Sequence, residues 1–162
     1  MLYNITYKLY YGWWTNEIMN GEASIVRLLQ GLHEHGIEST KEIAKDLQKL
    51  VDTDIESFTE AFYKDFIRMD FENYNKFEKL RHLNKKQRKR LNGNFLRRYE
   101  YRNTSNLRCI FIVCMENNND VPILLCAFNE DGDKKTGKKS YNKNIDRAID
   151  IFERVMGGKN GN

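Results

Sequence analysis

The sequence has one proline, three cysteines and no long hydrophobic run, and each of these scarcities excludes a class of protein. The longest apolar run, Cys109 to Met115, is far shorter than the roughly 20 residues that span a bilayer, so we expect no membrane partner. The first residues do not place a basic segment before an apolar one, as a secretory signal would. An odd number of cysteines inside apolar segments favours buried thiols in a reducing compartment. We therefore expect a cytoplasmic protein.

Motifs for metals and cofactors are scarce as well. His33 and His35 are two residues apart, so on a helix their imidazoles would point in different directions and make a poor metal site. The cysteines do not have the spacing of zinc ligands. Gly157 and Gly158 follow no expected strand, which argues against a phosphate-binding loop. The sequence thus predicts neither a metal nor another cofactor.

Positive charge is concentrated in one segment of the chain. Residues 76–108 contain twelve Lys or Arg against two Glu, whereas residues 21–75 contain twelve Asp or Glu against six Lys or Arg. The net charge of +4 hides this asymmetry. Such a basic segment predicts a surface that attracts phosphate groups. The alternative is a solvated basic helix that the acidic region offsets, and a further hypothesis is that the acidic region masks the basic surface.

The hydrophobic pattern changes from a helical period to strands along the chain. Residues 2–11 have the composition of a strand, and apolar stripes then predict helices within residues 25–36, 39–51, 53–69 and 72–91. A capping-box pattern beginning at Ser39 opens the second of these helices. Strands are expected over residues 95–102, 107–115 and 121–128, and a closing helix over residues 142–156.

This order of elements predicts the α+β class. We expect a small antiparallel sheet, a three-stranded meander, packed with several N-terminal helices and one C-terminal helix. The expected organisation is a mainly helical N-terminal region over residues 1–75, a core over residues 76–157 and a disordered tail over residues 158–162. The strands at 107–115 and 121–128 are apolar at nearly every position, which is typical of strands buried on both faces.

Arginine and tyrosine alternate in the strand that follows the basic helix. Alternation puts Arg98, Glu100 and Arg102 on one side of this strand, and Arg97, Tyr99 and Tyr101 on the other. Guanidinium groups bind phosphates and aromatic rings stack on unpaired bases, a combination that suits RNA. Cross-strand ion pairs and packing of the tyrosines against helices are the alternative. The candidate RNA-binding residues are Lys85, Lys86, Arg88, Lys89, Arg90, Arg97, Arg98, Tyr99, Tyr101 and Lys134.

The order of motifs over residues 76–157 resembles that of the RelE/HigB/ParE toxin superfamily. An Arg/Tyr-rich strand leads to Leu107-Arg-Cys-Ile-Phe, then to Val121-Pro-Ile-Leu-Leu-Cys-Ala-Phe, a lysine-rich loop and Tyr141-Asn-Lys-Asn-Ile-Asp-Arg-Ala. The resemblance implies a toxin of a type II toxin–antitoxin system. Such a protein cleaves mRNA without a metal, either free or on the ribosome, and is restrained by a cognate antitoxin. The N-terminal region is longer than that of typical members.

The resemblance also implies residues for catalysis. Arg108 corresponds to the arginine that opens the central strand and contacts the scissile phosphate, and Tyr141 falls where some members carry a tyrosine near the reacting ribose. The candidate catalytic residues are Arg108, Arg102, Lys135, Lys138, Lys139 and Tyr141. Two other functions stay open, namely a non-catalytic nucleic-acid-binding protein on the same fold and a ParE-like inhibitor that acts by protein binding.

Overall fold

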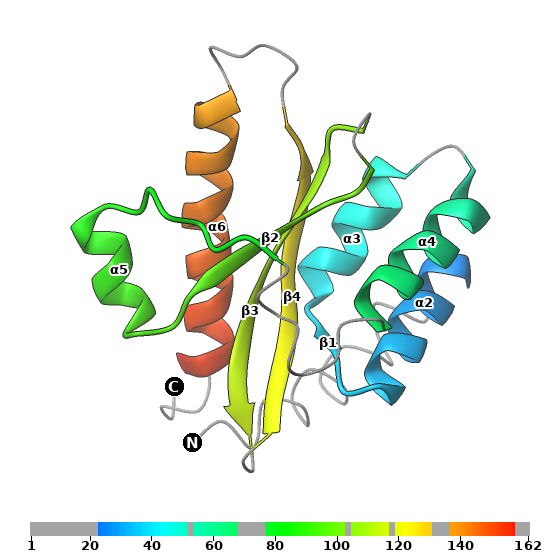
Figure 1. The fold of residues 1–162 in the computed structure, drawn as a ribbon, viewed down its shortest axis with the longest axis horizontal. Coiled ribbons are helices and arrows are strands. Elements are labelled where there is room, and N and C mark those ends of the chain that lie inside the picture. The colour runs from blue at the N-terminus through cyan, green and yellow to red at the C-terminus, as the bar shows by residue number, and fades with distance from the viewer. Residues whose placement is uncertain are drawn as a thin grey trace.

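The computed structural model describes residues 23–51, 54–67, 77–102, 105–116, 119–130 and 137–157. In chain order the elements are α2 (Ala23–Glu34), β1 (Glu38–Ser39), α3 (Lys41–Leu50), α4 (Ile55–Ile67), α5 (Lys85–Leu91), β2 (Leu96–Glu100), β3 (Leu107–Glu116), β4 (Asn119–Asn129) and α6 (Gly137–Gly157). The class is α+β, as predicted (Figure 1). The closing helix begins at Gly137 and not at the predicted Asn142. The strand expected at 2–11 and the tail expected at 158–162 lie outside the described residues.

β3 and β4 form the centre of the sheet and are apolar on both faces. They pair in antiparallel fashion along their whole length, from Leu107 opposite Asn129 to Glu116 opposite Asn119. Figure 1 shows α2, α3 and α4 on one side of the sheet and α5 and α6 on the other. Each layer of helices has its own cluster of buried residues with the sheet. The prediction that both faces of these strands are buried is confirmed.

The predicted three-stranded antiparallel meander is present as β2, β3 and β4, and the sheet as a whole is mixed because it includes a further strand, β1. Within the described residues it has four strands in the order β1-β4-β3-β2. β1 pairs parallel to β4, with Glu38 opposite Ile123 and Ser39 opposite Leu124. A strand of two residues is too short to leave a periodic pattern in the sequence, which is why the sequence did not indicate it.

Thr40 joins this short strand to the helix that follows. Its backbone N–H donates to Leu124 O at 3.1 Å, which extends the pairing of β1 by one bond. Its hydroxyl oxygen accepts from Ile43 N at 3.2 Å, and Thr40 is therefore the N-cap of α3. The cap predicted at Ser39 lies one residue too early.

The predicted helix over residues 72–91 is wrong for most of its described part, because α5 covers only Lys85–Leu91. Asn84 and Gln87 form a capping box that starts the helix at this point. The Asn84 side chain accepts from Gln87 N at 2.8 Å, and the Gln87 side chain accepts from Asn84 N at 2.9 Å. Because both of these N–H groups already have acceptors, the helix can begin at Lys85 without a preceding helical turn.

Residues 77–80 run instead along the outer edge of β2. Arg98 N donates to Glu78 O at 3.0 Å, Leu80 N donates to Leu96 O at 2.9 Å, and Lys79 forms a β-bridge with Arg97. The edge of β2 is thereby covered by the chain itself. This arrangement also positions the Glu78 side chain beside the sheet, where it takes part in the polar cluster described below.

The core between α4 and the sheet is aromatic. Phe66 is fully buried, and its ring centroid lies 4.7 Å from that of Phe62, 4.9 Å from Tyr99, 5.6 Å from Phe77 and 5.7 Å from Phe111. Aromatic pairs at these separations add to the free energy gained from burial. Residues on both sides of the boundary expected at residue 76 thus pack into one cluster.

We expect Phe66→Ala to lower the free energy of unfolding by about 3–5 kcal/mol, because it leaves a cavity among four aromatic rings. Urea denaturation followed by circular dichroism measures the change. Lys64→Ala in the same helix is the control and should change stability little, since its ion pair with Glu60 is exposed. A loss for Phe66→Ala no greater than that of the control would contradict this packing.

Candidate nucleic-acid interface

Two arginines and a tyrosine from separate segments meet in a polar cluster on the α6 side of the sheet. Arg98 is on β2, Arg108 is on β3 and Tyr141 is on α6. The guanidinium carbon of Arg98 lies 5.8 Å from the centroid of the Tyr141 ring. Both arginines approach the Glu100 carboxylate, at 3.5 Å for Arg98 and 3.7 Å for Arg108. The register of the sheet produces this meeting, because Glu100 is paired directly with Arg108.

Further glutamates orient the two guanidinium groups. Arg98 Nη2 lies 2.5 Å from Glu78, and Arg108 Nε lies 2.9 Å from Glu130. Arg108 also donates from Nη1 to the carbonyl oxygen of Ser105 at 2.8 Å, and its side chain is only 12% exposed. Charge-assisted bonds of this kind fix both the position and the plane of a guanidinium group. Burial works against the charged form of Arg98, but the neighbouring acidic groups raise its pKa.

The hydroxyl of Tyr141 is the unusual member of this polar cluster. Its oxygen is buried and has no hydrogen-bond partner among the residues that the structure describes. The ring packs edge-on against Phe128, with centroids 5.0 Å apart. Burial, together with the nearby Glu130 and Glu100, raises the pKa of Tyr141 against the opposing effect of the two guanidinium groups. The hydroxyl is therefore protonated at neutral pH and can donate a hydrogen bond to a ligand.

α5 docks on α6 through one face, and this face includes Arg90. Arg90 Nη2 lies 2.5 Å from Asp150 and 2.6 Å from Glu153, and these carboxylates raise the pKa of Arg90. Gln87 donates to Asp146 at 2.8 Å on the same face. Arg90 was predicted to bind RNA, but its guanidinium group is occupied by the carboxylates of α6.

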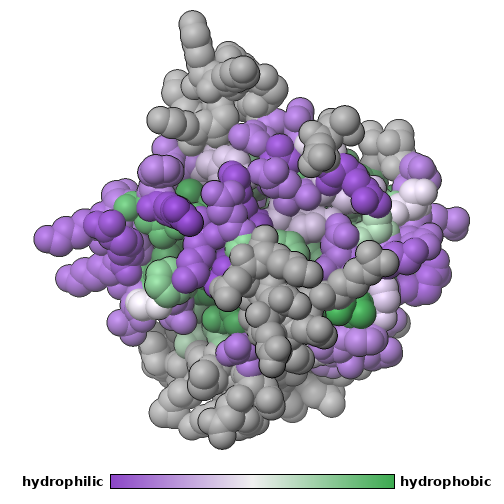
Figure 2. Space-filling model, viewed as in Figure 1, coloured by the Kyte–Doolittle hydropathy of each residue, from purple (hydrophilic) through white to green (hydrophobic). Residues whose placement is uncertain are grey.

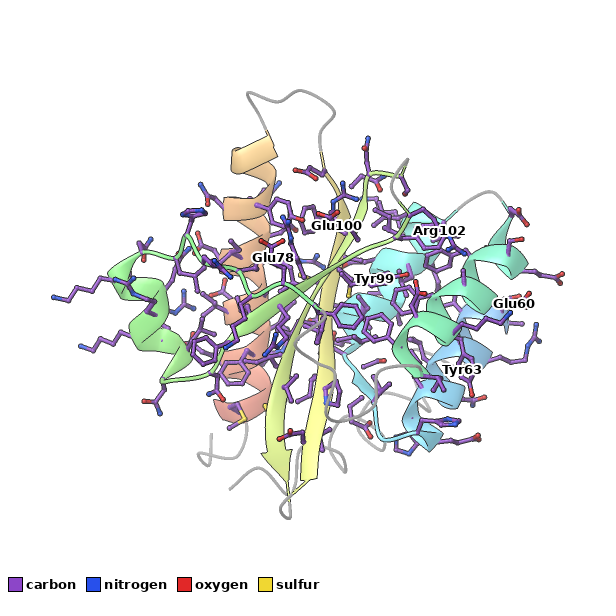
Figure 3. The ribbon with its side chains drawn as sticks, viewed as in Figure 1. Glu60, Tyr63, Glu78, Tyr99, Glu100 and Arg102 are labelled. Carbon is purple, nitrogen blue, oxygen red and sulfur yellow. The ribbon has the colours of Figure 1, made fainter. Side chains whose placement is uncertain are left out.

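The opposite face of α5 carries cations that point to solvent. Figure 3 shows side chains of α5 extending away from α6, and Figure 2 shows a hydrophilic surface at this place. Within the described part of the chain, these cations form no ion pair with an acidic residue. They are Lys85, Lys86, Arg88 and Lys89. Like charges at helical spacing repel one another, so phosphate groups would relieve this repulsion.

Two of the predicted RNA-binding residues, Tyr99 and Arg97, have their polar groups bonded inside the fold. Tyr99 is 5% exposed, and its hydroxyl donates to the Asp65 carboxylate. Its ring lies within the aromatic core and has no free face for a base. Arg97 is part-buried and donates to Phe77 O at 2.8 Å, and burial lowers its pKa. Strand alternation correctly put these two residues on one side of β2, but that side faces α4.

Arg102 does not join Arg108, contrary to the predicted catalytic set. β2 ends at Glu100, and Arg102 has a positive φ of 59°, so strand alternation no longer applies to it. Its guanidinium carbon lies 5.4 Å from the centroid of the Tyr101 ring. Figure 3 shows Arg102 toward α3 and α4, apart from Glu78 and Glu100.

The predicted lysines are divided between the loop and the last helix. Lys138 and Lys139 lie in the first turn of α6, close in sequence to Tyr141. Lys134 and Lys135 lie outside the described residues. The sequence prediction missed Glu78 and Glu130, because their meeting with the arginines depends on strand register and on the path of residues 77–80. Glu100 lies on the side of β2 that alternation assigned to it, and its approach to both arginines matches the alternative of cross-strand ion pairs. The pairing of Glu100 with Arg108 follows from the length of the turn between β2 and β3.

Comparisons with protein-family models, with curated proteins and with solved structures found no match for this chain. Within the described part of the chain, every helix is too short or too polar to cross a membrane. Among the same residues, no group of three His, Cys, Asp or Glu side chains is placed to hold a metal ion. The chemistry of the polar cluster and of α5 is therefore the basis for a functional proposal.

The two tyrosine hydroxyls should respond oppositely to removal. Tyr141→Phe should leave the free energy of unfolding unchanged or raise it by up to about 1 kcal/mol, because it deletes a buried polar atom that has no partner among the described residues. Tyr99→Phe should lower it by about 1–2 kcal/mol, because Asp65 loses its donor. Urea denaturation of the two variants in parallel measures both effects. An equal loss in both would contradict the described state of the Tyr141 hydroxyl.

Proposed function

We propose that this protein is a metal-independent endoribonuclease of the RelE/HigB toxin type, free or ribosome-dependent, and restrained by an antitoxin protein. The observation that carries the proposal is the meeting of Arg98, Arg108 and Tyr141, whose buried hydroxyl has no hydrogen-bond partner in the described part of the chain. Arg108 and Tyr141 are also the positions that the family resemblance implies for catalysis. Residues for binding phosphate and for donating a proton are thus present in one place.

The proposed reaction uses the nucleophile that RNA itself carries. The 2′-hydroxyl attacks the adjacent phosphorus, the bond from phosphorus to the 5′-oxygen breaks, and a cyclic phosphate and a free 5′-hydroxyl result. The enzyme has to accept the proton of the 2′-hydroxyl, stabilise charge on the phosphoryl oxygens and give a proton to the leaving oxygen.

The polar cluster contains a group for each of these tasks. A phosphate can replace Glu78 on Arg98 and Glu130 on Arg108, because it presents the same kind of acceptor oxygens to a guanidinium group. Glu100 approaches both arginines, at 3.5 Å from Arg98 and 3.7 Å from Arg108, whereas Glu78 pairs with Arg98 and Glu130 with Arg108, so we assign the proton of the 2′-hydroxyl to Glu100. Tyr141 keeps its proton at neutral pH and supplies it to the phosphoryl or leaving oxygen.

The outward face of α5 fits a role in holding the RNA backbone. α5 packs on α6, and the first turns of α6 carry Tyr141, so both features lie on the same side of the sheet (Figure 1). Contacts between lysine or arginine and phosphates are largely independent of sequence and weaken as salt rises. In the proposed function α5 supplies affinity and the polar cluster supplies chemistry.

A second candidate function is nucleic-acid binding without cleavage. The observation in its favour is that Arg98 and Arg108 are already paired with glutamates, whereas the outward cations of α5 have no acidic partner among the residues that the structure places. In that case the polar cluster stabilises the sheet and α5 alone contacts the nucleic acid. The two functions predict different effects of removing the Tyr141 hydroxyl, because only a ribonuclease would lose RNA cleavage.

Labelled mRNA incubated with the purified protein in EDTA, with and without ribosomes, should be cut. Tyr141→Phe should reduce the rate by about 100-fold or more, since it removes the proton donor, while the fold keeps its stability. Tyr63→Phe on α4 is the matched control and should cut at the normal rate, because Tyr63 lies outside the polar cluster. RNA binding without any cut in either condition would favour the second candidate function.

Replacing the four outward cations of α5 by glutamine should weaken RNA binding. The logarithm of the association constant falls as the logarithm of the salt concentration rises, and the magnitude of this negative slope should decrease by about 3. Fluorescence anisotropy across a salt series measures this slope. The control replaces Lys41, Lys45, Lys49 and Lys64 on α3 and α4, which changes net charge equally. An equal change in slope for the control would mean that net charge, and not α5, drives binding.

A further inference from the structure

A cavity of about 280 Å³ opens on the face of the sheet opposite Tyr141. It lies where the start of α4 meets the end of the β2 strand and the adjacent ends of β3 and β4. Its wall includes the aromatic residues Phe58 and Tyr101 and several residues with polar side chains. These polar residues are Asp54, Ser57, Ser105 and Asn129.

Tyr101 provides a supported aromatic surface at this cavity. Its ring packs edge-on against the buried ring of Phe58, with centroids 4.9 Å apart. The guanidinium carbon of Arg102 lies 5.4 Å from the centre of the same ring. A ring held in place in this way, with a cation beside it, suits an unpaired base and its phosphate.

We infer that this cavity binds one unpaired base of an RNA strand whose neighbouring phosphate lies at Arg108. The inference rests on the proposed function and names the part of the substrate that the second face of the sheet would recognise. Pockets for whole drug-sized ligands measure roughly 300–1,000 Å³. The smaller volume of this cavity fits a single planar base.

The cavity and the arginine are connected through the start of β3. Ser105 and Leu107 line the cavity, and their carbonyl oxygens accept from Arg108 Nη1 at 2.8 and 3.1 Å. Asn129 also lines the cavity and directly precedes Glu130, the partner of Arg108. An RNA strand that crosses this end of the sheet can therefore leave its phosphate at Arg108 and insert the adjacent base beside Tyr101.

Asp54 gives the cavity a preference among bases. Its carboxylate only accepts hydrogen bonds when ionised, and its carbonyl oxygen accepts from Phe58 N at 3.0 Å, which fixes the residue at the start of α4. Adenine, cytosine and guanine carry an exocyclic amino group that can donate to this carboxylate. Uracil has only its ring N3–H as a donor, and this N–H lies between two carbonyl oxygens that repel a carboxylate. The cavity should therefore favour these three bases over uracil.

The test measures binding of short single-stranded RNAs by fluorescence anisotropy, with the full chain carrying Tyr141→Phe so that the RNA stays intact. Three probes are compared, namely oligouridine, oligouridine with one central adenosine, and the same strand with an abasic site at the centre. The strand with adenosine should bind about tenfold more tightly than the other two, because it adds a hydrogen bond to a charged group.

Three further substitutions locate this preference. Tyr101→Leu removes the stacking surface, and Ser57→Phe fills the cavity from an exposed position without removing a core contact. Both should abolish the advantage of adenosine. Asp54→Asn should bring adenosine and uridine to within about twofold of each other, since asparagine offers donors as well as acceptors and tolerates the positive φ of 50° at this position as aspartate does. Thermal denaturation establishes that each variant is folded.

Equal binding of the three probes would overturn the inference, and so would an adenosine preference that persists in folded Tyr101→Leu and Ser57→Phe variants. Cleavage is measured separately with the wild-type protein. Cleavage whose rate is independent of the base at every position would support the proposed ribonuclease and contradict the base-binding site. If the protein does not cut RNA but shows a base preference that depends on Tyr101, the base-binding site is supported and the ribonuclease is contradicted.

Discussion

The pairing of β3 with β4 is the interaction on which the rest of this structure depends. Both strands are apolar on both faces, and a face left exposed to water would lose the free energy gained from burying its apolar surface. The chain therefore has to supply a layer of helices for each face, α2 to α4 on one and α6 with α5 on the other. The same register that aligns the apolar residues sets Arg108 opposite Phe128 at one end of the sheet and next to Glu100. The polar cluster is thus positioned by the hydrophobic pairing.

The acidic residues of α3 tie the two layers of helices together. Asp46 accepts from Ala127 N on β4 at 2.9 Å and from both terminal nitrogens of Arg147 on α6 at 2.7 and 2.9 Å. Glu42, one turn earlier, accepts from Arg154 farther along α6. These contacts give the negative charge of the N-terminal half a structural role at the edge of β4. They do not support the hypothesis that this charge masks the basic surface of α5.

The sequence allowed prediction of those features that repeat along the chain, and it failed where single contacts decide. Long apolar runs predicted β3 and β4, and the stripe from Ile25 to Leu32 predicted α2, because burial imposes a period on the residue types. The two residues of β1 have no period. The cap formed by Asn84 shortened an expected helix, and the positive φ of Arg102 removed it from the face that alternation assigned. Arg108 and Tyr141 could be expected at a site from the family resemblance, whereas Glu78 and Glu130 could not, because only tertiary folding brings them to the arginines.

The segment 77–80 along β2 links strand pairing at the edge of the sheet to anion binding by Arg98, two properties that are usually independent. A strand from another protein could pair with β2 only after displacing the hydrogen bonds that Glu78 and Leu80 make with it. That displacement also takes the Glu78 carboxylate away from Arg98, 2.5 Å distant in the closed arrangement. Occupancy of the sheet edge and the availability of Arg98 to an anion are therefore coupled, and the coupling is reciprocal. An anion that binds Arg98 in place of Glu78 must loosen the edge by the same free energy with which an added strand would free the arginine.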